Sequence, residues 1–238
     1  MSALPAAGGQ AVSASGSADE TPLTAPVVLF DFDGVLVCGD VMHEFLRRRY
    51  AASPWRWILV LASAPVLLGQ MLASRVAMWA TFGRLALLGM HATRYQGLVD
   101  DFAAYVVRRS GLCCRDGLRA MRHHMGAGER VLVVTTCEES LARAVFRELG
   151  LTEIEVLAAQ WCDSWSGMRQ ALHNSGANKV RLLARHGLES CLTAYTDSLL
   201  DAPMLRLAAQ AVLVNGTPAR CKKLEQALGR TVSRVAWH

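Results

Sequence analysis

Residues 27–35 of the chain, Val-Val-Leu-Phe-Asp-Phe-Asp-Gly-Val, join a short apolar run to two carboxylates. Four successive apolar residues, Val27 to Phe30, predict a strand that is buried on both faces, as in a parallel sheet. Asp31 and Asp33 follow it directly. An acidic pair is common in turns, but open α/β sheets bind ligands at the carboxyl ends of their strands. We therefore expect both carboxylates to face one crevice.

Four similar apolar runs follow further along the chain, at residues 131–134, 154–158, 191–195 and 211–214. Helical patterns lie between them, such as residues 140–149, ended by Gly150, and residues 179–186, ended by Gly187. An alternation of strands and helices predicts an α/β fold with a parallel sheet.

Residues 41–126 interrupt this alternation. They contain several helical patterns, including residues 93–109 and 112–125, and no run that resembles a strand. We therefore predict a helical cap at residues 41–126, inserted into a catalytic core made of residues 26–40 and 127–238. Residues 1–25 are rich in Ala, Ser, Gly and Pro and are predicted to be a disordered tail.

The predicted cap contains an unusually apolar segment, residues 57–90. Its first part, Trp57 to Ser74, is 18 residues long, carries no charge and has arginines on both sides. That length is at the lower limit for a membrane span, and Pro65 interrupts it. A hairpin or a pair of helices lying at an anionic membrane surface agrees with the basic flanks. The alternative is an apolar cap that packs on itself or on another subunit.

The composition limits the remaining choices. The net charge of +5 favours anionic partners, but no basic tract with interleaved aromatics indicates a nucleic-acid site, so we expect none. Seven cysteines without metal-like spacing predict free thiols in a reducing compartment. The first 25 residues lack the features of a secretory signal. We expect a location in the cytoplasm or at the cytoplasmic face of the inner membrane.

Three further groups of polar residues stand at strand ends or helix starts. Thr135 and Thr136 end the strand at residues 131–134, where a hydroxyl could bind a phosphoryl oxygen. Lys179 opens a helix, where its ammonium could offset phosphate charge. Asp197 and Asp201 follow the strand at residues 191–195. Each feature is ordinary alone, but four in this order are not.

This ordered set resembles the haloacid dehalogenase superfamily of phosphatases. The resemblance covers residues 27 to about 218 and rests on Asp-Phe-Asp-Gly-Val at 31–35, Thr135, Lys179 and Asp-Ser-Leu-Leu-Asp at 197–201. The stretch 201–215 is further similar to the branch that contains phosphoserine phosphatases. The resemblance implies a Rossmann-like core with a helical cap after the first strand.

The resemblance also implies a mechanism that uses Mg²⁺. Asp31 would be the nucleophile that forms an aspartyl phosphate, and Asp33 the acid and base. Mg²⁺ would be held by Asp31, the Asp33 carbonyl and Asp197. Thr135, Thr136 and Lys179 would bind the phosphoryl oxygens, and Asp201 would hold Lys179 or a metal-bound water.

The leaving group is the least determined feature. The apolar cap, with Phe-Leu-Arg-Arg-Arg-Tyr at 45–50 and Gln160 to Gly167 before the lysine, is similar to the phosphatidylglycerophosphatase C family, which implies a phospholipid substrate such as phosphatidylglycerophosphate. Two alternatives stay open. One is a soluble phosphatase or phosphotransferase for a small metabolite, and the other is a non-catalytic membrane scaffold. The oligomeric state is not predicted.

Overall fold

The structure, a computed structural model, describes residues 25–238. The predicted tail therefore lies outside the described residues, except for Ala25. Seven strands form one sheet in the order β4-β3-β2-β1-β5-β6-β7, and every pair is parallel except β3 with β4. The strands are β1 (Val27–Phe30), β2 (Arg130–Glu138), β3 (Glu155–Cys162), β4 (Arg169–Leu172), β5 (Cys191–Thr196), β6 (Ala208–Val214) and β7 (Ser233–Val235).

Helices cover both faces of this sheet, because alternate side chains of a strand point to opposite faces. Val28 and Phe30 of β1 belong to one buried apolar cluster, whereas Leu29 belongs to a second. The first cluster includes residues of α1 (Val41–Ala52), α5 (Ala92–Arg108), α6 (Arg115–Gly126) and α7 (Glu139–Glu148). The second includes residues of α8 (Ala177–Arg185), α9 (Ala202–Leu205) and α10 (Pro218–Leu228).

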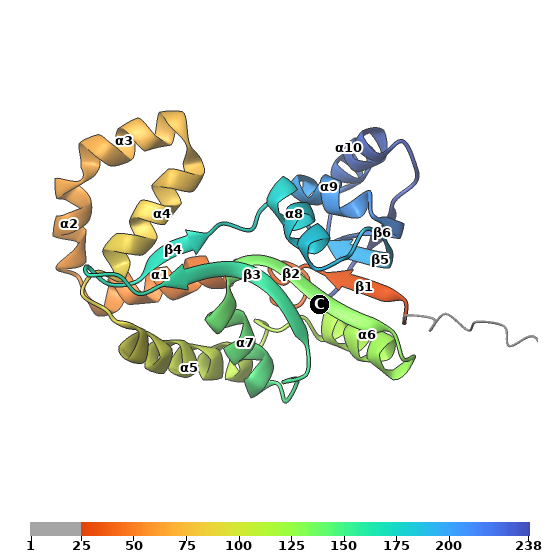
Figure 1. The fold of residues 1–238 in the computed structure, drawn as a ribbon, viewed down its shortest axis with the longest axis horizontal. Helices are drawn as coiled ribbons and strands as arrows, with labels where there is room; N and C mark the ends of the chain where they lie inside the picture. Colours follow the sequence, from red (N-terminus) through yellow and green to blue (C-terminus); the bar gives the residue numbers. More distant parts are fainter. Residues whose placement is uncertain (1–24) are drawn as a thin grey trace, which may run out of the picture.

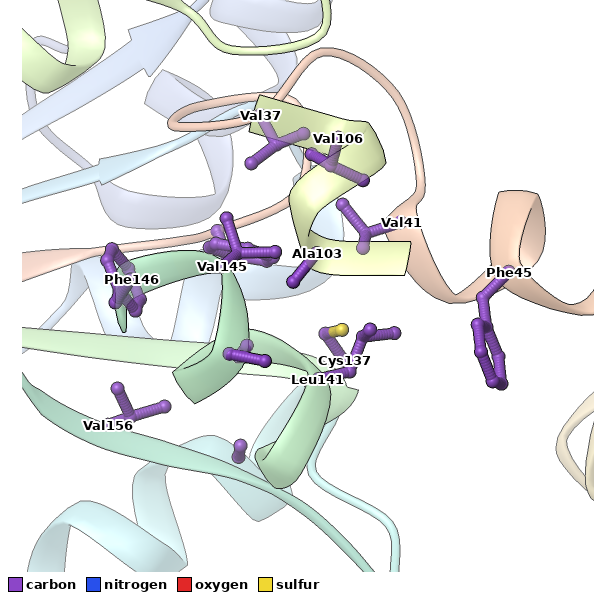
Figure 2. Close-up of a cluster of buried hydrophobic side chains, with 14 of the residues drawn as sticks. Val37, Val41, Phe45, Ala103, Val106, Cys137, Leu141, Val145, Phe146 and Val156 are labelled. Carbon is purple, nitrogen blue, oxygen red and sulfur yellow. The ribbon is translucent and has the colours of Figure 1, made fainter. Parts of the chain in front are cut away.

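The first cluster joins the predicted cap to the predicted core. Figure 2 shows Ala103 and Val106 of α5 close to Leu141 and Val145 of α7. Along the chain α5 belongs to the range predicted as cap and α7 to the range predicted as core, and the two helices pack against each other. The division into core and cap at residues 41 and 126 stays a prediction, but any relative motion of the two parts would have to disturb this shared packing.

Helices α2 (Arg56–Ala62), α3 (Ala64–Ala73) and α4 (Arg75–Ala86) extend away from the sheet (Figure 1). Single residues, Ser63 and Ser74, separate them. Within residues 25–238 no helix alone is long and apolar enough to cross a membrane. Helices α2 and α3 together meet that test of length and composition but bend by 67° at their junction. The apolar segment thus forms three short helices, and its contact with a membrane stays a prediction.

The predicted α/β fold class is confirmed, and all five predicted strands are present. Two strands were not predicted. β4 has only four residues and an alternating, half-exposed pattern, and β7 has only three residues. Neither contains the apolar run by which the other strands are recognised.

Candidate active site

β1 lies at the centre of the sheet, with β2 on one side and β5 on the other. The chain thus leaves β1 at a point where the order of strands changes direction, and such points form crevices at the carboxyl edge of α/β sheets. Asp31 is the first residue beyond β1, and its backbone N–H donates to Tyr195 O of β5 at 2.9 Å. This hydrogen bond to β5 holds Asp31 at the carboxyl edge of the sheet, where the sequence predicts it.

Lys179 forms the centre of the site. Its ammonium lies 2.9 Å from Asp31 Oδ2 and 2.8 Å from Asp201 Oδ2, and the side chain is only 1% exposed. Burial alone would lower the pKa of Lys179, but the two carboxylates outweigh it and raise the pKa. Lys179 is therefore a cationic bridge at neutral pH between residues that are 148 and 22 positions away along the chain.

Asp201 is held in place by a second donor. Thr196 Oγ1 donates to Asp201 Oδ2 at 2.8 Å, and the same hydroxyl accepts a hydrogen bond from Ser198 N. Burial opposes ionisation of Asp201, but Lys179 and Thr196 keep its pKa below the ordinary value. Burial raises the pKa of Asp31, while Lys179 opposes that rise. Of the two carboxylates that contact Lys179, Asp201 is thus the more firmly ionised.

Asp33 is placed differently from Asp31. Its Oδ1 accepts Val41 N of α1 at 2.8 Å, and its Oδ2 lies 3.4 Å from Thr135 Oγ1. Burial, followed by the nearby charge of Asp40, raises the pKa of Asp33 to about 7. A carboxyl group with such a pKa exchanges a proton readily near neutral pH, which is the property of a general acid and base.

Gly34 brings Asp197 close to the loop that follows β1. Its φ of +74° lies in the region that favours glycine, and a Cβ at this position would come within 2.4 Å of Asp197 Oδ2. The glycine therefore serves both the backbone turn and the approach of the carboxylate. The structure thus brings Asp31, Asp33, Asp197 and Asp201 to one cavity of about 340 Å³.

The two threonines in the last part of β2, which continues to Glu138, have different environments. Thr135 is fully buried, and its hydroxyl accepts Cys137 N at 2.9 Å while facing Asp33. Thr136 is exposed and lines the cavity. Geometry therefore gives Thr136 direct access to a bound group, and places Thr135 behind it as a support for Asp33.

Three residues of this region were not predicted. Asp40 and Ser175 line the cavity beside Thr136. Asn174 is buried and donates to Thr135 O and Leu157 O at 3.0 Å, which fixes the loop before α8 to β2 and β3. Asp40 also caps α1 by accepting His43 N, and this capping pattern is the one signal in the sequence that marks it.

The sequence after Thr136 also has a structural explanation. Glu138 is buried, and its carboxylate accepts Ser140 N and Leu141 N at the start of α7 and the hydroxyl of Tyr95 of α5. One side chain thus caps a helix of the core and binds a helix of the predicted cap. Glu138 fixes the position of the residues just after the cavity.

The donor atoms of the cavity suit Mg²⁺. Among residues 25–238, no group of three or more His, Cys, Asp or Glu side chains is arranged to hold an ion by itself. Mg²⁺, however, usually binds one or two carboxylates and keeps several waters. Asp31 and Asp197 supply such carboxylates. The close approach of Asp197 to Gly34 places Asp197 beside the loop that carries Asp31. The residues therefore fit the ion.

The comparison with protein families agrees with this geometry. The model of the haloacid dehalogenase-like hydrolases matches residues 28–206. The chain belongs to this family. The match begins inside β1 and ends beyond Asp201, so it contains every predicted site residue.

Individual relatives point the same way. The chain is 32% identical over 233 residues to a protein of Mycobacterium tuberculosis H37Rv named phosphoserine phosphatase SerB1, an alignment that covers 92% of this chain and 74% of that protein. A solved structure of unknown function from Bordetella pertussis Tohama I has a TM-score of 0.66 at 19% identity, covering 88% of this chain and 98% of that one.

A further structure, of a phospho-aspartyl intermediate analogue of phosphoserine phosphatase, has a TM-score of 0.54 at 13% identity, covering 88% of this chain and 93% of that one. At this identity the two structural similarities show the fold. Together with the family match, these relatives confirm the predicted superfamily and the prediction that this hydrolase is a phosphatase. The finer resemblance to phosphatidylglycerophosphatase C finds no counterpart among them.

Proposed function

We propose that this hydrolase cleaves phosphate monoesters by forming a phosphoryl intermediate on Asp31, with Mg²⁺ as its cofactor. The supporting observation is the pair of salt bridges that Lys179 forms with Asp31 and Asp201, next to Asp33, whose pKa is raised to about 7. The cation brings positive charge to the place where a phosphoryl group must approach an anionic nucleophile.

Asp31 and Asp33 have separate roles in the proposed reaction. A carboxylate oxygen of Asp31 attacks phosphorus as the bond from phosphorus to the leaving oxygen breaks, and Asp33 gives that oxygen its proton. In the second half, ionised Asp33 takes a proton from the water that attacks the aspartyl phosphate, which regenerates Asp31. Lys179, with Thr136 at the cavity wall, stabilises the equatorial oxygens.

The cofactor would be held by Asp31, the backbone carbonyl of Asp33 and Asp197. When bound, it supplies positive charge that lowers repulsion between the phosphoryl group and the carboxylates and favours ionised Asp31. The raised pKa of Asp31 in the protein alone is a reason to expect dependence on such a cation.

We propose a small phosphorylated metabolite as the substrate, with phosphoserine as the first compound to test. The catalytic cavity shares Asp40, Thr136, Ser175 and Leu200 with an adjoining cavity of about 320 Å³. Asp40 and Arg75 bring opposite charges to that second cavity, which suits the amino and carboxylate groups of an amino acid. The name of the mycobacterial relative supports the same choice.

A phosphorylated lipid is a second candidate, favoured by the walls of the same adjoining cavity. Its lining includes the apolar side chains of Met42, Val76, Trp79 and Trp161. Serine has no apolar group to fill such walls, whereas the glycerol and acyl chains of a lipid do.

Release of inorganic phosphate would test both parts of this proposal. We expect hydrolysis of an aryl phosphate that requires Mg²⁺ and falls at least about a thousandfold in Asp31→Asn, since the nucleophile is lost. A comparison of phosphoserine with phosphatidylglycerophosphate in detergent then identifies the leaving group. Full activity of folded Asp31→Asn would disprove the mechanism. A preference for the lipid would overturn only the choice of a small metabolite.

A further inference from the structure

The helices that extend from the sheet carry an exposed apolar surface. Ten of the thirteen large apolar side chains that are exposed among the described residues lie between residues 55 and 79. Leu61 and Leu72 are the most exposed of these, at 73% and 86%. Single exposed apolar residues are normal, but a concentration of this kind marks an interaction site. The apolar surface consists of Trp55, Trp57, Ile58, Leu61, Val66, Leu68, Met71, Leu72, Val76 and Trp79.

The charges carried by this part of the chain are of one sign. From residue 45 to residue 99 the chain has seven arginines, no lysine, and no aspartate or glutamate. Arg56 is buried, where it donates to Leu85 O and Leu88 O, but Arg75, Arg84 and Arg94 are exposed. An anionic surface complements such a border. A second copy of the chain would bring the same positive charges to the interface, which opposes pairing through this surface.

The shape of the segment suits the interface of a membrane more than its interior. Helices α2 and α3 are bent by 67° and have 7 and 10 residues, so neither can cross a bilayer alone. Short apolar helices with basic borders lie parallel to the membrane at the level of the head groups. Tryptophan is enriched at this level, and the surface contains three tryptophans, Trp55, Trp57 and Trp79.

A cavity within the same surface could receive part of a lipid. It has a volume of about 370 Å³ and lies between α1, α2 and α4, and its walls include Tyr50, Trp57, Trp79 and Phe82. Trp79 also lines the cavity that adjoins the catalytic site. Lipid contact at this surface would therefore place the entrance of the catalytic site next to the bilayer.

We propose that the apolar surface docks this hydrolase onto anionic membranes, with α2 and α3 lying among the head groups. The docking does not depend on the catalytic role of Asp31 or on the identity of the substrate. A phosphatase for a small metabolite could dock in the same way, so failure of the substrate assignment would leave this inference intact.

Sedimentation of the full chain with vesicles tests the docking. We expect binding to vesicles of phosphatidylglycerol and phosphatidylcholine, and at least about tenfold weaker binding to pure phosphatidylcholine. The double variant Leu61→Glu/Leu72→Glu should bind the anionic vesicles at least about tenfold less well, because charge replaces two inserted side chains. The matched control is Leu192→Glu, which alters an exposed leucine outside the apolar surface and should bind normally.

Hydrolysis of a soluble aryl phosphate without vesicles separates docking from catalysis. Both variants should keep the wild-type rate, which also shows that they are folded. Equal sedimentation of wild type and the double variant would overturn the proposal. It would also be overturned if the wild type failed to bind anionic vesicles and instead formed a dimer that the double variant abolished.

Discussion

The carboxyl edge of the sheet and the surface of α2 to α4 differ in which side chains they bury and which they expose. At the edge, Lys179 and Asp201 are almost completely buried, and each has charged or hydrogen-bonded partners. On the helices, Leu61 and Leu72 are apolar and mostly exposed, without neighbours to cover them. The first region contains charged groups that the fold buries and pairs, and the second contains apolar groups that it leaves exposed.

This difference shows where stability and function depend on the same residues. A buried ion pair costs desolvation, so removing one partner leaves a charge that the protein interior cannot solvate. An exposed leucine contributes little to the free energy of unfolding because it is not buried, so its removal destabilises the fold little. We therefore expect substitutions at the edge to affect both folding and catalysis. Substitutions on the apolar surface should affect only association.

The largest effect on stability is expected for Lys179→Met. The variant leaves Asp31 and Asp201 buried without their shared cation, and we expect a loss of about 3–5 kcal/mol in the free energy of unfolding. Urea unfolding at neutral pH measures it. Lys223→Met, at an exposed position, is the control and should change stability by less than about 0.5 kcal/mol. Equal stability of the two variants would mean that the carboxylates do not need the cation.

A smaller effect of opposite sign is expected for Asp33→Asn. Its pKa is raised from 3.8 to about 7 on folding, so the folded protein binds this proton more tightly than the unfolded chain. The ionised form therefore costs stability, and the cost grows from about pH 4 to about pH 7 and then stays constant. Without metal, Asp33→Asn should be more stable than wild type by about 1–2 kcal/mol at pH 8.

The two proteins should become similar in stability near pH 4, and thermal unfolding in a chelator across this range measures the difference. Turnover of Asp33→Asn should at the same time fall at least about a hundredfold. If the variant is less stable than wild type at pH 8, the surroundings of Asp33 favour its carboxylate, and folding does not raise its pKa.

The edge of the sheet was largely predictable from the sequence, and the reason is geometric. Apolar runs of four or five residues end at polar residues, and parallel strands bring these ends to one edge. The sequence alone therefore predicts that Asp31, Lys179 and Asp201 lie together. The different positions of Thr135 and Thr136 could not be predicted, since both are near the end of the same apolar run and only side-chain packing decides which hydroxyl faces the cavity.

The α2 to α4 region was predictable in composition but less so in shape. The uncharged segment indicated apolar helices, but the division at Ser63 and Ser74 gives three helices where a pair was expected. Ser74 accepts Ala77 N and caps α4, a pattern that the sequence contains. Ser63 has no such capping bond, but Pro65 in the first turn of α3 marks the break, because proline is tolerated at a helix start and not in a helix interior.

The smallest effect is expected for Leu72→Ser. The side chain is 86% exposed, so its removal should change the free energy of unfolding by less than about 0.5 kcal/mol. Leu132→Ala, at a buried position of β2, is the comparison and should cost about 2–5 kcal/mol, because it leaves a cavity in the core. Urea unfolding of both variants, at several protein concentrations, measures this contrast.

A loss of 2 kcal/mol or more in Leu72→Ser would show that another surface covers this leucine in the free protein. A concentration-dependent loss would identify that surface as a second copy of the chain, since only association makes stability depend on concentration. A small change at every concentration would mean that the apolar side chains of α2 to α4 do not serve the fold. Their retention would then have to be explained by what the helices bind.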